Sequence, residues 1–451
     1  MSALAAPRDG RTDGADVELW LDFVLLGAAL SVGAAGILLA EWLRRRRPDP
    51  ADPPPEDPPP PKRPPEPADS GLPTFRVVAL GLEGAGKTVL LASQFHTLSG
   101  LDRNRRYFLD SDLPQEQFLE WIFGRVSDTS ESWPPGSHIG GTREFLFDCK
   151  ARDSRREVRN LFRLSYLDYA GELLEPSPGQ PEALQEVADR VQGAHALLVL
   201  VDGRRALQLL RGDAAGGDYF DRRMRPLLRL AGRSSCPVQL IITKWDVLRA
   251  GRPEARDDEE RLQEVRDRLE QCAGIEHLLH ATGTAQRKVR LIPVSAVGES
   301  FAELLPDGTT AKRSGAIVNP INVEVPLCAV LPDLLTHLED SHIPAEVREE
   351  LDAELSLRPL ADVPTIVHAV LVSPAGRLLR KALSGIVGDE VIKLLVDVLA
   401  RVRSREKAPP AQVGADEEDV GQLRAAVVEQ MEGVVHGLEF SLPSSVLRSR
   451  W

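Results

Sequence analysis

The sequence predicts an α/β fold that carries a transmembrane helix at its N-terminus and a helical region at its C-terminus. Three observations indicate this organisation: apolar runs of strand length lead into polar or glycine-containing turns, residues 23–40 are uncharged, and apolar residues recur at helical spacing beyond residue 344. We expect a short extracytoplasmic tail (1–18), a transmembrane helix (19–43), a proline-rich linker (44–73), a large α/β domain (74–340) and a helical C-terminal region (341–451).

The uncharged stretch FVLLGAALSVGAAGILLA runs from Phe23 to Ala40. Roughly 20 apolar residues in a helix cross the hydrocarbon core of a bilayer. Acidic residues precede the stretch and Arg44–Arg47 follow it, so the positive-inside rule places the C-terminal side in the cytoplasm. We expect a single-pass protein of the cytoplasmic (inner) membrane with its N-terminus outside. A cleaved signal peptide and a buried core helix are the alternatives, although a signal peptide would begin basic and have a shorter apolar core.

Residues 48–73 are dominated by proline, interleaved with charged residues. Such a composition cannot form a packed core and favours extended polyproline II, so we expect a stalk. A docking site for proline-binding modules is the alternative.

The overall composition excludes several function classes. A net charge of -13 argues against nucleic acid as a partner. The cysteines contain no CxxC pair, which indicates neither a zinc site nor a disulfide framework. They are Cys149, Cys236, Cys272 and Cys328.

A phosphate-binding loop is predicted at GLEGAGKT, from Gly81 to Thr88. It follows the strand-like run FRVVALGL and precedes a helical pattern, the context that this motif requires. Its glycines allow backbone N–H groups and the helix N-terminus to face phosphate oxygens. Lys87 would reach the β- and γ-phosphates, and the Thr88 hydroxyl would bind Mg²⁺. The candidate nucleotide-binding residues here are Gly81, Glu83, Gly84, Ala85, Gly86, Lys87, Thr88 and Val89.

A second segment, DYAG, follows the strand-like run FRLSYLD, which ends at Asp168. We expect Asp168 at the carboxyl edge of a sheet, where open α/β folds bind ligands, holding Mg²⁺ directly or through water. The Gly171 amide would touch the γ-phosphate, and the loop would be released once that group is gone. The run from Arg143 to Lys150 is expected to be an antiparallel partner strand.

Thr142, which leads that partner strand, is our candidate for a further Mg²⁺ ligand from a mobile switch segment. Thr129 is a rival, and a Thr142 that merely faces solvent is the other alternative. Arg143 is a candidate for an arginine that stabilises transition-state charge.

A base-recognition segment follows in PVQLIITKWD. The Asp246 carboxylate can accept from guanine N1–H and N2–H together, while the Lys244 stem lies over the ring. After the strand VRLIPVS, the Ala296 amide would pair with guanine O6 and meet a donor clash from adenine. The candidate residues of this part are Thr243, Lys244, Asp246, Ser295, Ala296 and Val297.

These segments, GLEGAGKT, DYAG, TKWD and SA, occur in the order found in guanine-nucleotide hydrolases. Over residues 74 to about 340, the chain resembles TRAFAC-class, Ras-like P-loop GTPases. Its layout is similar to that of membrane-anchored bacterial GTPases of the conflict-system or double-GTPase type. The resemblance implies a P-loop NTPase fold, a doubly wound and mostly parallel sheet of about six strands with helices on both faces. It also implies GTP or GDP with Mg²⁺ as ligands.

The resemblance further implies hydrolysis of GTP to GDP and phosphate, as a switch for an unknown protein effector. The candidate catalytic residues are Lys87, Thr142, Gly171 and Glu172. Glu172 stands where the family commonly carries a glutamine that orients water, and a carboxylate cannot donate to a phosphate oxygen. We therefore expect slow turnover, and a Glu172 that is a plain surface residue is the alternative. Thr243 stands where the family more often has asparagine, which we expect to weaken a contact that braces the loop.

Two other functions stay open. The first is a GTP-binding membrane adaptor or receptor subunit with little hydrolysis. The second is an ATP-using P-loop enzyme, against which Lys244 and Asp246 argue. Inserts near residues 100–140, 203–235 and 249–288 are expected to select the partner.

The C-terminal region is predicted to form helices whose apolar stripes belong to a core rather than to a partner surface. The first stripe comprises Leu379, Leu383, Ile386, Leu394 and Val398, and the second comprises Val420, Leu423, Val427, Met431, Val434 and Leu438.

Overall fold

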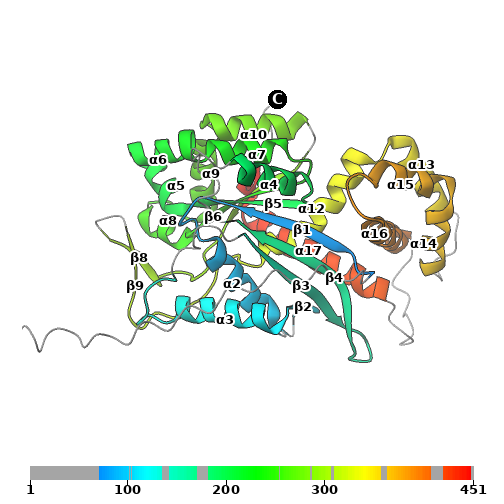
Figure 1. Ribbon diagram of the computed structural model, residues 1–451, viewed down its shortest axis with the longest axis horizontal. Helices are drawn as coiled ribbons and strands as arrows, with labels where there is room; N and C mark the ends of the chain where they lie inside the picture. Colours follow the sequence, from blue (N-terminus) through cyan, green and yellow to red (C-terminus); the bar gives the residue numbers. More distant parts are fainter. Residues whose placement is uncertain are drawn as a thin grey trace, which may run out of the picture. The chain divides into compact units, whose positions relative to one another are not determined.

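An eight-stranded sheet with the order β10-β7-β6-β5-β1-β4-β3-β2 forms the core of the protein. The computed structural model describes residues 71–100, 102, 104–134, 142–169, 181–252, 254–284, 287–305, 309–356, 363–407 and 420–447 (Figure 1). All of them belong to the second of two units of the chain, Pro60–Trp451.

The central strands are parallel, and they are β1 (Thr74–Leu80), β4 (Val158–Asp168), β5 (Ala196–Asp202), β6 (Val238–Thr243) and β7 (Val289–Pro293). Every residue of β5, β6 and β7 is buried. Continuous apolar strands of this kind form where helices cover both faces of a parallel sheet.

Antiparallel strands lie at the two edges of the sheet, and they are β2 (Tyr107–Asp110), β3 (Arg143–Arg152) and β10 (Val446–Leu447). The inner residues of β3 alternate between buried and half-buried, so its pattern has the period of two that a strand imposes. The antiparallel partner strand expected from Arg143 to Lys150 is confirmed. The α/β fold with a large, mostly parallel sheet is also confirmed.

Helices cover both faces of the sheet. Figure 1 shows α2 (Lys87–Ser99) and α17 (Val420–Ser441) on one face, with α4 (Pro181–Gln192), α7 (Arg225–Arg233) and α10 (Ala273–Thr284) on the other. The described ranges before residue 300 also contain the helices α3 (Leu113–Ser127), α5 (Gly203–Leu210), α6 (Ala214–Asp218), η2 (Tyr219–Arg223), α8 (Trp245–Gly251) and α9 (Asp258–Leu269).

The C-terminal part is helical, as expected. Its helices are α11 (Val325–Cys328), α12 (Val330–His337), η3 (Leu338–His342), α13 (Ala345–Ser356), α14 (Val363–Val372), α15 (Pro374–Leu383), α16 (Asp389–Lys407) and η4 (Pro443–Ser445). Both predicted apolar stripes lie in the core: most of their members are buried, and Ile386, Val420 and Val434 pack half-buried against them.

The expected fold class was wrong in including a transmembrane helix. No helix in the described ranges is both long and apolar enough to cross a membrane. The 22-residue α17 has the length, but it carries three glutamates and an arginine, and a charged side chain at the bilayer centre costs at least ~2.5 kcal/mol. The helix expected over 19–43 lies outside the described residues. The single-pass location in the inner membrane and the bilayer as a partner are corrected on the same finding.

Candidate functional site

Most of the predicted site residues that the structure describes lie at the carboxyl edge of the parallel strands. In register, Ala79 of β1 pairs with Asp168 at the end of β4, and Asp202 at the end of β5 pairs with Thr243 at the end of β6. Because parallel strands end at the same edge, motifs far apart in sequence come together there.

The loop between β1 and α2 has the backbone geometry of a phosphate cradle. Gly84 and Gly86 have φ angles of 74° and 86°, a region that other residues rarely adopt. Gly86 precedes the first turn of α2, and no side chain caps that end of the helix. The N–H groups of the first turn therefore remain available for an anion. A Cβ on Gly81 would lie 3.1 Å from the Leu200 Cβ, so this end of the loop packs closely on β5.

Lys87 lies inside this loop. Its side chain is 7% exposed, and its ammonium donates to the Gly81 carbonyl at 2.8 Å. Burial lowers the pKa of Lys87, and the negative charges of Asp168 and Glu83 partly offset that shift. A phosphate in the loop would supply the anionic partner that this buried ammonium favours.

Thr88 and Asp168 form the metal-binding half of the candidate site. The Thr88 hydroxyl donates to Asp168 Oδ2 at 2.8 Å. Asp168 is 3% exposed, and its Oδ1 has no hydrogen-bond partner in the described part of the chain. Burial raises the pKa of Asp168, partly offset by Lys87 and the Thr88 hydrogen bond. A hydroxyl beside a buried carboxylate with an unpaired oxygen fits Mg²⁺, which takes one or two carboxylates and completes its shell with phosphates and water.

Asp246, Ser295 and Ala296 form the base-binding half. Asp246 is 6% exposed, and its Oδ1 accepts from the Ser295 hydroxyl at 2.5 Å. Its Oδ2 is buried and has no hydrogen-bond partner among the residues that the structure describes. Burial raises the pKa of Asp246, and the bond from Ser295 partly offsets it. The Ala296 carbonyl accepts from Ser93 at 3.1 Å, whereas its N–H finds no acceptor among the described residues. One acceptor and one donor are thus unsatisfied at the same end of the sheet.

Thr243 joins the two halves. Its hydroxyl donates to the Ala85 carbonyl of the phosphate loop at 2.8 Å and lies 3.2 Å from the Val201 carbonyl. The bracing contact that we expected a threonine to weaken is therefore present.

Lys244 is held by two oxygens. Its ammonium donates to the Gly84 carbonyl at 2.7 Å and to Asp202 Oδ2 at 2.9 Å. No sequence motif pointed to Asp202. The available signal was an acidic residue directly after the apolar run ALLVLV, at the end of an unrecognised strand.

Several expected residues are not placed in the site. Gly171 and Glu172 lie outside the described residues, and Thr142 is exposed at the start of β3, next to the residue that pairs with Asp168. The rival Thr129 instead accepts from the Gly315 amide at 3.3 Å. The remaining candidates flank the loops: Glu83 is exposed, Val89 is half-buried and Val297 is buried.

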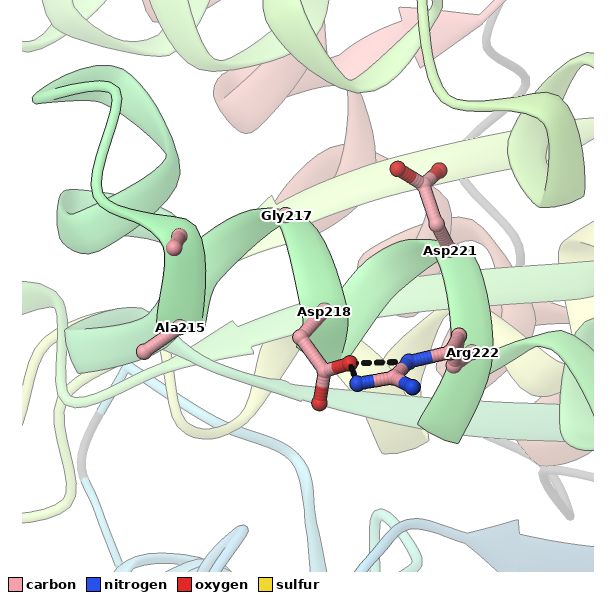
Figure 2. Close-up of a pocket in the computed structure, with 6 residues that line it drawn as sticks. Ala215, Gly217, Asp218, Asp221 and Arg222 are labelled. Atoms are coloured by element: carbon pink, nitrogen blue, oxygen red, sulfur yellow. Dashed lines mark hydrogen bonds and ion pairs between the residues drawn. The ribbon is translucent and has the colours of Figure 1, made fainter.

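A surface depression lies elsewhere, on α6 and η2 (Figure 2). Figure 2 shows an ion pair between two of its lining residues, Asp218 and Arg222. It contains none of the predicted site residues. Its lining residues are Ala214, Ala215, Gly217, Asp218, Asp221 and Arg222.

The chain shows only limited similarity to known proteins. No family model matches the chain, and no curated protein matches it. Among solved structures, Sup35 complexed with GDP is 18% identical over 50% of this chain and 38% of its own, with a TM-score of 0.26. The elongation factor SelB from Methanococcus maripaludis with a GTP analogue is 13% identical over 50% of this chain and 30% of its own, with a TM-score of 0.22. The chain thus spans well under half of either protein. Its own fold and loop geometry fit the P-loop class of nucleotide-binding proteins.

Proposed function

We propose that the protein binds GTP and hydrolyses it to GDP and phosphate with Mg²⁺, as a nucleotide-dependent switch for a protein effector. One observation carries the proposal: a phosphate half around Lys87 and a base half around Asp246 share one sheet edge and are joined by Thr243. Such an edge is where open α/β folds bind ligands.

The unsatisfied groups of the base half complement guanine. Asp246 Oδ2 is an acceptor for N1–H and N2–H, and the Ala296 N–H is a donor for O6. Adenine presents an amino group where guanine has O6 and lacks both donors. A site whose buried polar groups stay unpaired with the wrong ligand rejects that ligand strongly.

The phosphate half would stabilise the charge of phosphoryl transfer. Water attacks the γ-phosphorus, the bridging oxygen leaves with GDP, and a proton is released with phosphate. Lys87 would hold the β- and γ-oxygens, while Thr88, Asp168 and the proposed ligand Thr142 would hold Mg²⁺, which neutralises the charge on those oxygens. Gly171 is proposed to contact the γ-phosphate, and Glu172 to accept a hydrogen bond from the attacking water.

A nucleotide panel on the full-length chain tests this proposal. GDP–Mg²⁺ and GTP–Mg²⁺ should raise the melting temperature, and ATP–Mg²⁺ should not. The Asp246→Asn variant should lose about a hundredfold in GDP affinity, because two charge-assisted bonds at ~1.5 kcal/mol or more each are lost. It should gain affinity for xanthine nucleotides, since an amide donates where the carboxylate accepted. Stabilisation by ATP alone would refute guanine recognition, and an unchanged preference in the variant would refute the base-site assignment.

A second candidate is a GTP-binding adaptor with little hydrolysis. It is favoured by Glu172, a residue that cannot donate to a phosphate oxygen. A single-turnover hydrolysis rate below the rate of nucleotide release would select the adaptor, and a faster rate would select the GTPase.

A further inference from the structure

Asp202 is a buried charge that no nucleotide motif explains. It ends β5 at the carboxyl edge of the sheet and is 3% exposed. Its Oδ1 accepts from the Arg204 amide at 2.9 Å, which caps α5, and its Oδ2 accepts from the Lys244 ammonium at 2.9 Å. A buried carboxylate is costly unless it is paired, so its position here requires a partner charge.

Two charges pair with Asp202: the Arg204 guanidinium donates to Oδ2 at 3.1 Å, and so does the ammonium of Lys244, the lysine of the base-recognition segment, at 2.9 Å. The Lys244 backbone has a φ angle of 53°, in the left-handed region that side chains disfavour, and its ammonium also contacts the Gly84 carbonyl at 2.7 Å. A free lysine side chain loses up to ~2 kcal/mol of rotamer entropy when it is fixed. The charge-assisted bond to Asp202 offsets part of that cost, because ionised partners bind more strongly than neutral ones.

The backbone around Asp202 is itself tightly packed. A Cβ on Gly203 would lie 2.2 Å from the Thr243 carbonyl oxygen, so the turn after β5 lies directly against the turn after β6. The Tyr219 hydroxyl of η2 accepts from the Asp202 amide at 3.4 Å. The position of the carboxylate relative to Lys244 is therefore set by neighbouring elements from two sides.

The Asp202 carboxylate is ionised despite its burial. Burial raises the pKa of Asp202, but Lys244 and Arg204 outweigh that effect and the net pKa lies below its usual range. The carboxylate therefore stays ionised at neutral pH.

We propose that Asp202 is a positioning residue for guanine-nucleotide affinity: it fixes the Lys244 side chain across the phosphate loop, so that the aliphatic stem forms one wall of the base pocket. This inference rests on the proposed function and deepens it, because it adds a residue that acts on the base through Lys244.

To test the proposal, calorimetry on the full-length chain measures the dissociation constant of GDP for the wild type and three variants. Asp202→Asn should bind GDP about tenfold more weakly, or ~1.4 kcal/mol, and Asp202→Glu should lie between it and the wild type. Asp213→Asn, in an exposed residue before α6, is the matched control and should bind as the wild type does. If Asp202 acted only as the cap of α5, Asp202→Asn should bind GDP as tightly as the wild type and Asp202→Glu should bind it less tightly, because asparagine caps a helix as well as aspartate does.

A double-mutant comparison decides whether Asp202 acts through Lys244. In a Lys244→Met background, Asp202→Asn should cause no further loss of GDP affinity. Additive losses, or an Asp202→Asn variant equal to the wild type, would overturn the proposal. If the asparagine variant does not fold, as judged by circular dichroism, the same comparison with Asp202→Glu decides it. If the wild-type chain binds no guanine nucleotide, both the proposed function and the positioning role are refuted. If the wild type binds GDP and the losses of affinity from Asp202→Asn and Lys244→Met add, only the positioning role is refuted.

Discussion

Asp168 and Asp246, two of the predicted site residues, each carry an expected cost in stability. Each is a buried carboxylate that keeps one oxygen without a hydrogen-bond partner within the described ranges. An unsatisfied buried oxygen costs about 1–3 kcal/mol, and more when it is charged. Groups left in this state are suited to binding a ligand, and motif spacing in the sequence predicts both of them as site residues.

The pH dependence of stability should reveal the cost of Asp246. Burial raises the pKa of Asp246 in the folded, ligand-free chain. Between its ordinary and raised pKa the folded state binds more protons than the unfolded state, so the penalty is fully present above this window and is relieved as the pH falls through it. Asp246→Asn should therefore unfold at higher urea than the wild type near neutral pH, with a smaller advantage toward pH ~4. Asp213→Asn should show no such advantage; an equal effect of both variants would contradict the prediction.

Lys87 should account for much of the affinity for the triphosphate. Lys87→Ala removes a buried cation whose charge-assisted bonds to phosphate are worth about 1.5–3 kcal/mol each, so GTP–Mg²⁺ should bind at least tenfold more weakly. Calorimetry on the full-length chain measures this change. Lys393→Ala, which removes a half-buried lysine paired with Glu390 on α16, is the control and should leave GTP binding intact.

At the scale of elements, a small hairpin links the base half to the end of α3. Strands β8 (Ala302–Leu304) and β9 (Thr310–Lys312) follow the SA segment. The Trp133 indole donates to the Thr310 carbonyl at 2.8 Å, and the Lys312 ammonium lies 5.0 Å from the centre of the Trp133 ring. Lys312 also donates to the Asp128 carbonyl at 2.9 Å. Residues beyond one base motif are thereby held against the segment that precedes Thr142.

Replacing Trp133 should loosen this hairpin. Trp133→Ala removes the indole bond, the cation–π contact and the packing on Phe301, so the free energy of unfolding should fall by about 2 kcal/mol. Limited proteolysis should then cut faster between residues 304 and 316. Trp121→Ala, in the half-buried tryptophan of α3, serves as control: it should lower stability without selective cleavage there. Equal cleavage in both variants would contradict hairpin docking.

At the scale of the whole molecule, the C-terminal segment completes the α/β sheet. Strand β10 pairs antiparallel with β7, and Arg424 of α17 donates to the Leu161 carbonyl of β4 at 2.8 Å. Arg290 of β7, 2% exposed, pairs with Asp333 of α12 and with Glu439 of α17. The last helix thus contacts strands far apart in sequence.

The two partners of Arg290 should differ in their contribution to stability. Asp333 is as buried as Arg290 and binds it through two oxygens at 2.5 and 2.6 Å, whereas Glu439 is partly exposed. Asp333→Asn should therefore cost about 3–5 kcal/mol, as breaking a buried pair does, and Glu439→Gln about 1 kcal/mol or less. Urea denaturation compares them, and equal losses would refute the assignment of Asp333 as the principal partner.

The sequence by itself determined the features that depend on short spacing. Patterns between residues close together in the sequence predict several features. These are the glycine loop, the strands that lead into it and into Thr243, the antiparallel strand before Asp168, and the apolar stripes of the C-terminal helices. These local patterns also predicted that Asp168 would end a strand, although they did not point to Asp202 at the end of β5.

Only the tertiary structure decided the contacts between distant segments. Asp202 beside Lys244, Trp133 under the β8–β9 hairpin and β10 beside β7 join residues 42, 177 and more than 150 positions apart. No periodicity encodes such partners, because their proximity depends on strand order and on how each turn packs against the next. The bond from Thr243 to the Ala85 carbonyl has the same origin, and it joins two separate motifs at one edge of the sheet.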